Sequence, residues 1–363
     1  MAFSLGSLGS LFAQPSKSAL GVDIGTSSIK VVQLRREKGR VILETYGAIA
    51  LGPYAGVEVG RATALPAEKI AEALKDVVRE ANVTVQNGAF SIPYASSLVS
   101  ILTLPSSVEG QLAQVVPLEA RKYIPVPINE VLLDWFVISG GGQKSNPQGK
   151  LEVLMVAIHN DTIAKFRTIA QQAGLAVDFF EIEVFSAVRA ALDHGIAPVA
   201  VVDMGAATTK FYVVERGVIH ESHIISHGSQ DVTLAASRAL STTVADAEQK
   251  KRKFGMSGEL GGEAMKQSAE LTLSVLFSEL ARTVTAYEAR ANQPLSELVL
   301  TGGGATLKGL MEFAQTSIQT PIRRADPFGK TQAPAFLEAI LKEAGPEFAV
   351  AVGLALRRLQ ENG

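Results

Sequence analysis

The sequence contains no cysteine, and only 5 of its 363 residues are histidines. The absence of cysteine excludes disulfides, thiolate catalysis and zinc–cysteine sites. Three histidines, at positions 220, 223 and 227, fall on a predicted strand and its end, where we expect plain surface or interior roles rather than metal binding. Charged residues make up 19% of the chain and nearly cancel to a net charge of −2, so the composition indicates no attraction to nucleic acid.

Long apolar runs are also missing. No stretch reaches the roughly 18 consecutive apolar residues that a membrane-spanning helix requires. Residues 1–17 scatter Phe and Leu among Gly and Ser without a basic start or a continuous apolar segment. We therefore expect a flexible tail rather than a signal peptide, with contact to a membrane or a partner as the alternative. Together these features predict a soluble cytoplasmic protein, in which 47% hydrophobic residues suffice for two or three packed domains.

One short segment, residues 21–30 with the sequence GVDIGTSSIK, has the form of a phosphate-binding hairpin. Asp23 ends an apolar strand, and Gly25 permits a positive φ and a close approach to the backbone. The Thr-Ser-Ser run that follows offers N–H and hydroxyl donors to a phosphate, and the carboxylate is placed to hold a hydrated cation. A single copy of this pattern is more typical of an ordinary hairpin turn than of a phosphate site.

The same pattern returns in residues 201–214, with the sequence VVDMGAATTKFYVV. The two copies are spaced by 180 positions at three landmarks: Asp23 and Asp203, Gly25 and Gly205, and Lys30 and Lys210. A hairpin that repeats at half the length of the chain predicts two related halves that face each other. This internal repeat favours a phosphate-binding role over an ordinary turn.

A run of three glycines, residues 302–304, follows the apolar segment 298–300 and precedes a predicted helix. Bare backbone admits a flat ring or a phosphate, and the start of a helix favours an anion. Alone, the run fits a tight strand-to-helix turn equally well, but two phosphate hairpins upstream favour a nucleotide. Glu248 and Lys251 share one face of a charged helix and are candidates to bracket a ribose and a base, with a solvated face as the alternative.

The predicted helices and strands divide the chain into two α/β halves. Strands followed by a helix begin the first half, and alternating strands and helices after about Gly88 form a compact insertion, unless they simply extend the first sheet. The expected divisions are a flexible tail (1–17), a first domain (18–87), the insertion (88–175), a linking helix with a return to the first domain (176–199), a second domain (200–345) and a C-terminal helix that packs on the first domain (346–363).

Two Asp-x-Gly hairpins, a linking helix, a charged helix and a Gly-Gly-Gly turn resemble the actin/Hsp70/sugar-kinase ATP-binding fold. This resemblance implies an α/β, actin-like ATPase fold with two ribonuclease-H-like domains around a nucleotide cleft. Several stretches further resemble the PilM family of actin-like type IV pilus assembly proteins, which is related to FtsA: EARKYIP at 119–125, PINEV at 127–131, LDW at 133–135, QAGL at 172–175 and FAVAVGLALR at 348–357. In that branch an inserted subdomain, called 1C, is found at the position of residues 88–175. The resemblance covers about residues 18–358.

The resemblance implies ATP or ADP with Mg²⁺ as ligands. Asp23 and Asp203 would order the Mg²⁺ through water, and Glu183, on the linking helix, would orient an attacking water. The implied nucleotide contacts are Gly25, Thr26, Ser27, Ser28 and Lys30 on one side of the phosphates, Gly205, Ala206, Ala207 and Thr208 on the other, Glu248 and Lys251 at the ribose and base, and Gly302, Gly303, Gly304, Leu307 and Lys308 at the adenosine.

The function that follows from the resemblance is a cytoplasmic scaffold of the pilus inner-membrane platform. Such a protein captures the cytoplasmic N-terminal peptide of PilN in a groove between subdomains 1A and 1C, meets the membrane only through partners, and couples nucleotide state to assembly with at most weak ATPase activity. The resemblance also implies contacts with other platform components and with assembly ATPases, and weak self-association. It implies no binding to nucleic acid. The alternatives are an FtsA-like filament protein, disfavoured because the sequence ends soon after residues 348–358, and a small-molecule kinase, which would need a further catalytic Asp.

Overall fold

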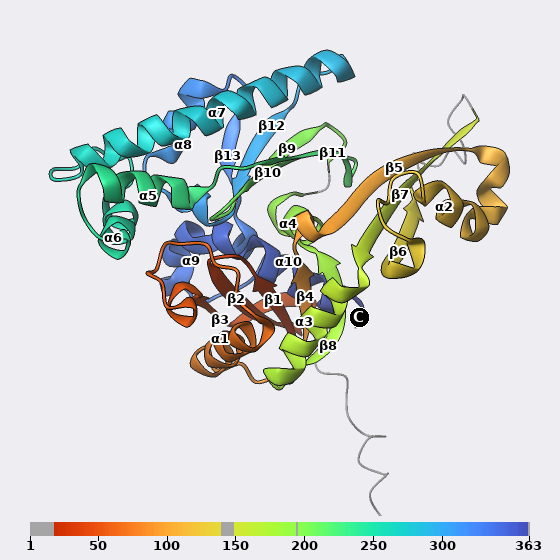
Figure 1. The fold of residues 1–363 in the computed structure, drawn as a ribbon, viewed down its shortest axis with the longest axis horizontal. Helices are drawn as coiled ribbons and strands as arrows, with labels where there is room; N and C mark the ends of the chain where they lie inside the picture. The colour runs from red at the N-terminus through yellow and green to blue at the C-terminus, as the bar shows by residue number, and fades with distance from the viewer. Residues whose placement is uncertain (1–17, 139–148, 194, 362–363) are drawn as a thin grey trace, which may run out of the picture.

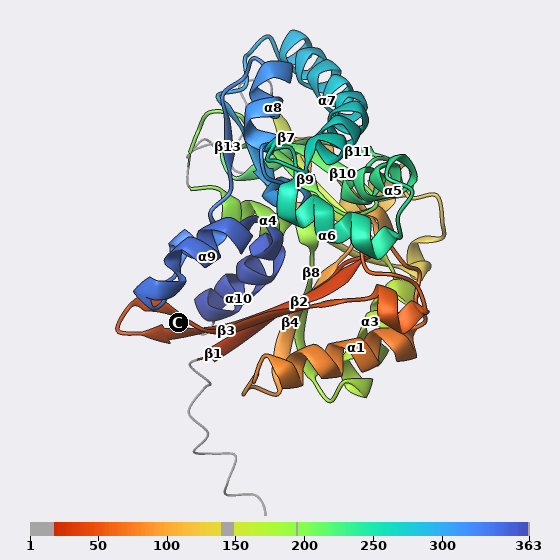
Figure 2. The same ribbon diagram turned by 90° about the vertical axis from the view of Figure 1, so that its left-hand side faces the viewer.

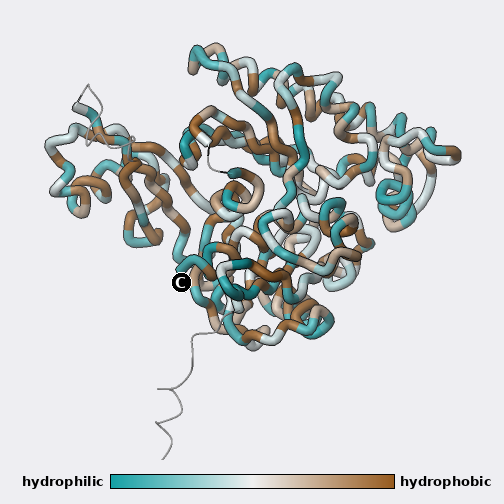
Figure 3. The backbone as a smooth tube through the Cα atoms, turned by 180° about the vertical axis from the view of Figure 1, so that it is seen from behind, coloured by the Kyte–Doolittle hydropathy of each residue, from teal (hydrophilic) through white to brown (hydrophobic). Residues whose placement is uncertain are grey.

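A computed structural model describes residues 18–138, 149–193 and 195–361. The predicted tail 1–17 lies outside the described residues. Two five-stranded sheets form the body, and a third sheet of three strands projects from it as an arm (Figure 1). Hydrophobic stretches run through the strands and through the helix segments that lie against them (Figure 3).

The first sheet has the strand order β3-β2-β1-β4-β8. Its strands are β1 (Ser18–Ile24), β2 (Ser28–Glu37), β3 (Arg40–Ala50), β4 (Asn87–Ile92) and β8 (Ala176–Ile182). One face packs on α1 (Ala67–Glu80) and α3 (Asn160–Gln172), and the other on α10 (Ala349–Glu361), with α4 (Glu183–Ala191) beside α10 (Figure 2). The apolar face of α1, with Ile70, Leu74 and Val77, is buried in this core.

The second sheet repeats this arrangement with the order β11-β10-β9-β12-β13. Its strands are β9 (Val199–Met204), β10 (Thr209–Glu215), β11 (Val218–Ile225), β12 (Glu297–Thr301) and β13 (Ile322–Arg324). Its helices are α5 (Ser229–Ala239), α6 (Val244–Phe254), α7 (Glu263–Ala291) and α8 (Leu310–Ser317). Each strand of one sheet therefore has a counterpart in the other, and the duplication predicted from the two hairpins is confirmed.

The arm consists of the sheet β5-β7-β6 and the helix α2. These elements are β5 (Ser97–Pro105), β6 (Val131–Val137), β7 (Lys150–His159) and α2 (Leu112–Ala120), and a small core around Leu102, Val116 and Val153 is their own. The predicted insertion, 88–175, is therefore too wide. Strand β4 pairs in parallel with β1, and α3 packs on α1, so both ends of that range belong to the first sheet.

Short helices connect the larger elements. They are α9 (Glu338–Ala344) and the 3₁₀ helices η3 (Gly52–Ala55), η4 (Tyr94–Ser96), η5 (Ser106–Gln111), η6 (Ile128–Glu130), η7 (Gly303–Thr306), η8 (Pro327–Lys330), η9 (Ala335–Leu337) and η10 (Gly345–Phe348). Within the described part of the chain, every helix is too short or too polar to cross a bilayer.

Helices α4 and α10 pack tightly where the chain passes between the two sheets. A Cβ at Gly353 would collide with the carbonyl of Ser186, so only glycine allows this approach. Next to this contact the buried carboxylate of Glu181 bonds to Arg189 at 2.7 Å and to Arg357 at 2.8 Å. Close packing and a buried ion pair thus join β8 to both helices.

Candidate nucleotide-binding cleft

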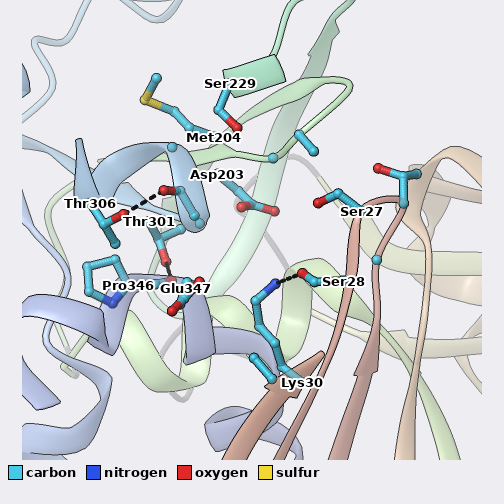
Figure 4. A pocket seen from close by; sticks show the side chains of 18 of the residues that line it. Ser27, Ser28, Lys30, Asp203, Met204, Ser229, Thr301, Thr306, Pro346 and Glu347 are labelled. Atoms are coloured by element: carbon cyan, nitrogen blue, oxygen red, sulfur yellow. Dashed lines mark hydrogen bonds between the residues drawn. The ribbon is translucent and has the colours of Figure 1, made fainter. Parts of the chain in front are cut away.

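A cleft of about 680 Å³ lies between the two sheets. It is lined by both hairpin turns, by the Gly-Gly-Gly turn and by α6, with Ser27, Ser28 and Lys30 on one side and Asp203 and Met204 on the other (Figure 4). The predicted site residues that line it are Asp23, Gly25, Thr26, Ser27, Ser28, Lys30, Glu183, Asp203, Gly205, Ala206, Ala207, Thr208, Glu248, Lys251, Gly302, Gly303, Gly304 and Leu307.

Lys308 is the one predicted site residue that does not line the cleft. The chain turns after η7, and Gly309 takes a φ of +75°. The exposed Lys308 consequently lies against the end of α6, where its carbonyl accepts a hydrogen bond from Met256 N at 2.7 Å. The predicted adenosine contact of Lys308 is therefore not supported by its position.

The two hairpin turns have the same hydrogen bond at the same relative position. Gly25 N donates to Ser28 O, and Gly205 N donates to Thr208 O, each at 3.0 Å. Neither glycine uses the positive φ that glycine permits. Space is the reason for glycine instead, because a Cβ at Gly205 would lie 2.8 Å from the Thr208 carbonyl oxygen and one at Gly25 would lie 3.2 Å from that of Ser28.

The carboxylates of the two hairpins have different partners. Asp23 is buried and accepts a hydrogen bond from Ser91 Oγ of β4 at 2.9 Å. Burial raises the pKa of Asp23 above its ordinary value, although Lys30 and the Ser91 bond oppose that rise. Asp203 instead accepts a bond from Lys210 Nζ, across the strand pair, at 3.0 Å. The cleft thus holds two buried carboxylates, one from each sheet.

Lys210 also bonds to Glu183, the first residue of α4, with 2.8 Å between Nζ and Oε2. Burial by itself would lower the pKa of Lys210, but the carboxylates of Asp203 and Glu183 raise it above its ordinary value. The other oxygen of Glu183, Oε1, accepts a hydrogen bond from Tyr94 N at 2.7 Å. Burial raises the pKa of Glu183, and Lys210 offsets only part of that rise.

Glu248 and Lys251 form a buried pair on α6 rather than a solvated helix face. Their side chains join at 2.6 Å, and only 5% of Glu248 and 9% of Lys251 is exposed. Thr233 of α5 donates to Glu248 at 2.7 Å and accepts from Lys251 at 2.8 Å. Burial alone would raise the pKa of Glu248, but Lys251, Thr233 and Arg252 together lower it. A buried pair that is held by hydrogen bonds in this way presents its polar groups to the cleft at a fixed position.

The Gly-Gly-Gly turn packs against the second hairpin. Gly302 has a φ of +82°, and a Cβ there would lie 2.7 Å from the carbonyl oxygen of Met204. A Cβ at Gly304 would lie 2.7 Å from the Met204 side chain. Thr301 Oγ1 donates to the carbonyl of Pro346 at 3.0 Å (Figure 4). Gly302 N donates to the same carbonyl at 2.9 Å. The turn is therefore fixed on both sides, and bare backbone faces the cleft.

A loop of the first domain, residues 57–63, lies across the cleft against α5 and α6. Glu58 Oε2 accepts from Val244 N at 3.1 Å, and Ala62 N donates to Gln230 Oε1 at 2.9 Å. Gly60 approaches the side chain of Glu248, because a Cβ there would lie 3.0 Å from the Glu248 Cβ. The 57–63 loop therefore joins the two domains on the side of the cleft that holds the Glu248–Lys251 pair.

These residues fit a nucleotide with Mg²⁺. Backbone N–H and hydroxyl groups at two facing turns suit phosphate oxygens, and two buried carboxylates suit a hydrated divalent cation. Among the residues that the structure describes, no three His, Cys, Asp or Glu side chains gather closely enough to bind an ion directly. The cation would therefore depend on water and on the phosphates for most of its ligands, as Mg²⁺ prefers.

Sequence reasoning missed several groups that bond to the residues of the cleft. Ser91, which anchors Asp23, and Tyr94, which bonds to Glu183, come from the segment that we assigned to the insertion. Lys210 appeared only as a repeat landmark, although its cross-strand position opposite Asp203 follows from the hairpin register. Ser91 gives no local signal, because its place beside Asp23 depends on the parallel pairing of β4 with β1.

Comparisons with known proteins agree with this geometry. The family model described as "Type IV pilus assembly protein PilM" matches residues 21–359. Among solved structures, a PilM–PilN type IV pilus biogenesis complex is similar with a TM-score of 0.78 and 24% identity, covering 94% of this chain and 98% of that one. The ethanolamine utilization protein EutJ from Carboxydothermus hydrogenoformans is similar with a TM-score of 0.54 and 18% identity, covering 94% and 90%.

Among curated proteins, the cell division protein FtsA of Bacillus subtilis (strain 168) is 22% identical over 354 residues, covering 85% of this chain and 78% of that protein. FtsA of Streptococcus pneumoniae serotype 2 is 23% identical, covering 81% and 72%. These likenesses confirm the predicted actin-like ATPase fold. Because the family model spans almost the whole described region, the chain belongs to the PilM family of type IV pilus assembly proteins.

Proposed function

We propose that this chain is an ATP-binding scaffold of the type IV pilus inner-membrane platform. In this role it binds ATP or ADP with Mg²⁺ in the cleft and the cytoplasmic N-terminal peptide of a PilN-like protein between the first domain and the arm. The observation that carries the proposal is the convergence of two phosphate hairpins, a glycine turn and a buried Glu–Lys pair on one cleft in a PilM-family chain. The solved relative that contains both PilM and PilN supports the choice of partner.

Within the cleft, each element takes the ligand group that its chemistry suits. The turns at residues 25–28 and 205–208 hold the phosphates with backbone N–H and hydroxyl donors. Asp23 and Asp203 order the Mg²⁺ through water. The Glu248–Lys251 pair binds the ribose and base, and the bare backbone of 302–304 seats the adenosine with Leu307. The 57–63 loop joins the two domains beside the Glu248–Lys251 pair.

ATP hydrolysis is slow in this proposal. Phosphoryl transfer needs a positioned water and added positive charge on the transferring group. Glu183 is the carboxylate proposed to orient water, but both of its oxygens already accept hydrogen bonds, from Lys210 Nζ at 2.8 Å and from Tyr94 N at 2.7 Å. The bound nucleotide therefore acts mainly as a bridge between the two domains, and its presence or absence shifts the angle between them.

The arm has the surface that a peptide partner would need. Leu132 and Phe136 lie on β6, an edge strand, and their side chains are 54% and 50% exposed. Unpaired strand edges and exposed apolar side chains are features that extended peptides recognise. Through this partner, and through further platform components such as assembly ATPases, the protein is held at the cytoplasmic face of the inner membrane. Self-association is weak.

Calorimetry tests the proposal. A synthetic peptide of the PilN-like N-terminus is titrated into the full chain, first loaded with MgATP and then without nucleotide, and a scrambled peptide serves as the control. We expect specific binding that is tighter in the loaded protein. Absence of peptide binding to the loaded protein would contradict the proposed scaffold function. Failure to bind MgATP in a separate titration would contradict the proposed nucleotide site.

A further inference from the structure

We infer that Glu183, Lys210 and Tyr94 form a relay that couples the cleft to the arm. The inference rests on the proposed function, because it requires that a nucleotide occupies the cleft. It adds to that function the residues through which the cleft acts on the segment where the chain enters the arm. Glu183 is in this view a positioning residue rather than a residue that activates water.

The first step is the position of Glu183. It is the first residue of α4, it lines the cleft, and its side chain is largely buried. Both of its carboxylate oxygens already accept a hydrogen bond, Oε2 from Lys210 Nζ at 2.8 Å and Oε1 from Tyr94 N at 2.7 Å. One carboxylate therefore connects a side chain of the second sheet to the backbone of the first domain.

The second step is the position of Tyr94. Strand β4 of the first sheet ends at Ile92 and strand β5 of the arm begins at Ser97, so Tyr94 lies in the short connection between them. This connection is one of the two places where the chain passes between the first sheet and the arm, and Ser97 Oγ bonds back to Pro93 O at 3.1 Å. A displacement of the Tyr94 backbone must therefore move the start of β5.

The third step is the charge on Lys210. Its ammonium is shared between Glu183 and Asp203, at 2.8 and 3.0 Å. A hydrated cation would compete with Lys210 for Asp203, and phosphate oxygens would compete with both carboxylates for Lys210. Either competition alters the bond between Lys210 and Glu183, and Glu183 passes that change to Tyr94 N. The relay thus responds to the charge present in the cleft.

A second contact ties Tyr94 to the same domain as Lys210. The Tyr94 hydroxyl bonds to Ser222 Oγ of β11, at the open edge of the second sheet. Tyr94 is therefore held by its N–H through Glu183 and by its hydroxyl through Ser222. If the second sheet rotates relative to the first while Tyr94 stays fixed, at least one of these two bonds breaks. A rotation that keeps both bonds therefore moves Tyr94 and, with it, the connection into the arm.

Hydrogen exchange of the full chain tests the relay, with and without saturating MgATP. We expect MgATP to change the exchange rate of the β5 amides about tenfold in the wild type, within the range of allosteric couplings. Glu183→Gln keeps the shape of the side chain but loses the charge that bonds to Lys210. In this variant the exchange rates of the β5 amides with and without MgATP should differ by less than about twofold. The fluorescence of Trp135, the only tryptophan and a residue of β6 in the arm, provides an independent signal.

Two further variants keep the test decisive. Tyr94→Phe removes only the hydroxyl contact and should reduce the exchange response while MgATP still binds. Glu44→Gln and Tyr54→Phe are matched controls, because Glu44 bonds to Gln33 and Tyr54 to Asp76, both away from the cleft, and the full response should remain.

The outcomes separate the two proposals. A wild type that fails to bind MgATP overturns the proposed function, and the relay with it. A wild type that binds MgATP without any response in the arm overturns the relay alone. A full response in nucleotide-saturated Glu183→Gln and in Tyr94→Phe also overturns the relay, because neither contact would then be needed.

Discussion

Replacement of Asp203 by asparagine removes one carboxylate charge from the cleft and changes little else. The amide has the shape of the carboxylate, and Asp203 is buried near the end of β9. Lys210 keeps its second bond, to Glu183 at 2.8 Å, so the variant leaves no buried ammonium without a partner. We therefore expect Asp203→Asn to fold normally and to lose mainly its response to Mg²⁺.

The size of the loss follows from the one interaction that disappears. A hydrogen bond to a charged group contributes about 1.5–3 kcal/mol, and we take about 2–3 kcal/mol for the water-mediated contact between Asp203 and the cation. A loss of about 2–3 kcal/mol weakens binding roughly 30- to 150-fold. Affinity for ATP without Mg²⁺ should change little or rise slightly, because the variant removes a negative charge from the neighbourhood of the phosphates.

Titration calorimetry with ATP, in Mg²⁺ and in a chelator, measures the two affinities separately. The matched control is Asp76→Asn on α1, which replaces a carboxylate that bonds to the Tyr54 hydroxyl at 2.6 Å outside the cleft. The control should keep the full increase in affinity that Mg²⁺ gives. If Asp203→Asn kept it too, Asp203 would have no part in ordering the cation and the assignment of the second hairpin would be wrong.

Two other contacts give predictions of a different kind. Burial alone would raise the pKa of Glu181, but Arg189, Ser186 and Arg357 together lower it, so its contribution to stability is present above the ordinary glutamate pKa and is lost as the pH falls through the lowered value. Glu181→Gln should lower the free energy of unfolding by about 3 kcal/mol at neutral pH, the low end for a broken buried ion pair, because both arginines stay partly hydrated. Denaturant titrations of the wild type and the variant measure this difference, which should become smaller in acid. Combining Glu58→Gln with Gln230→Ala weakens the contacts of the 57–63 loop by about 1–2 kcal/mol and should speed nucleotide release roughly tenfold. Stopped-flow release of a fluorescent ATP analogue measures this rate, and an unchanged rate would exclude the loop from gating the cleft.

Local patterns in the sequence were sufficient to predict the duplicated framework. A hairpin is specified by residues within a few positions of one another, so its recurrence at 180 positions could be read directly and the matching strand orders confirm it. The extent of the arm could not be read in this way. Strand β4 belongs to the first sheet because of its parallel pairing with β1, and a contact between distant segments leaves no mark on the local pattern of β4.

The burial of charged residues was hidden for a related reason. Helix α6 carries Glu248 and Lys251 among other charged residues, and its composition is that of a solvated helix. Thr233, on a separate helix, supplies the hydroxyl that lets the pair be buried. The sequence also left open the reason for glycine at position 25, since a lack of space around the Cβ and a positive φ both select glycine.

The two copies of the hairpin agree in backbone and in their charged residues but differ in the partners that their lysines bond to, and this difference bears on function. Asp23 and Lys30 stand opposite each other in the strand register, as do Asp203 and Lys210. In the first copy the lysine bonds to Ser28 within its own turn at 3.0 Å, whereas in the second copy it reaches out of the hairpin to Glu183. Duplication alone would give a symmetric clamp in which both lysines serve the phosphates. Because only the second lysine is bonded to the linking helix, a change of charge in the cleft acts unequally on the two sides, and the side that carries Glu183 and Tyr94 is the one that leads to the arm.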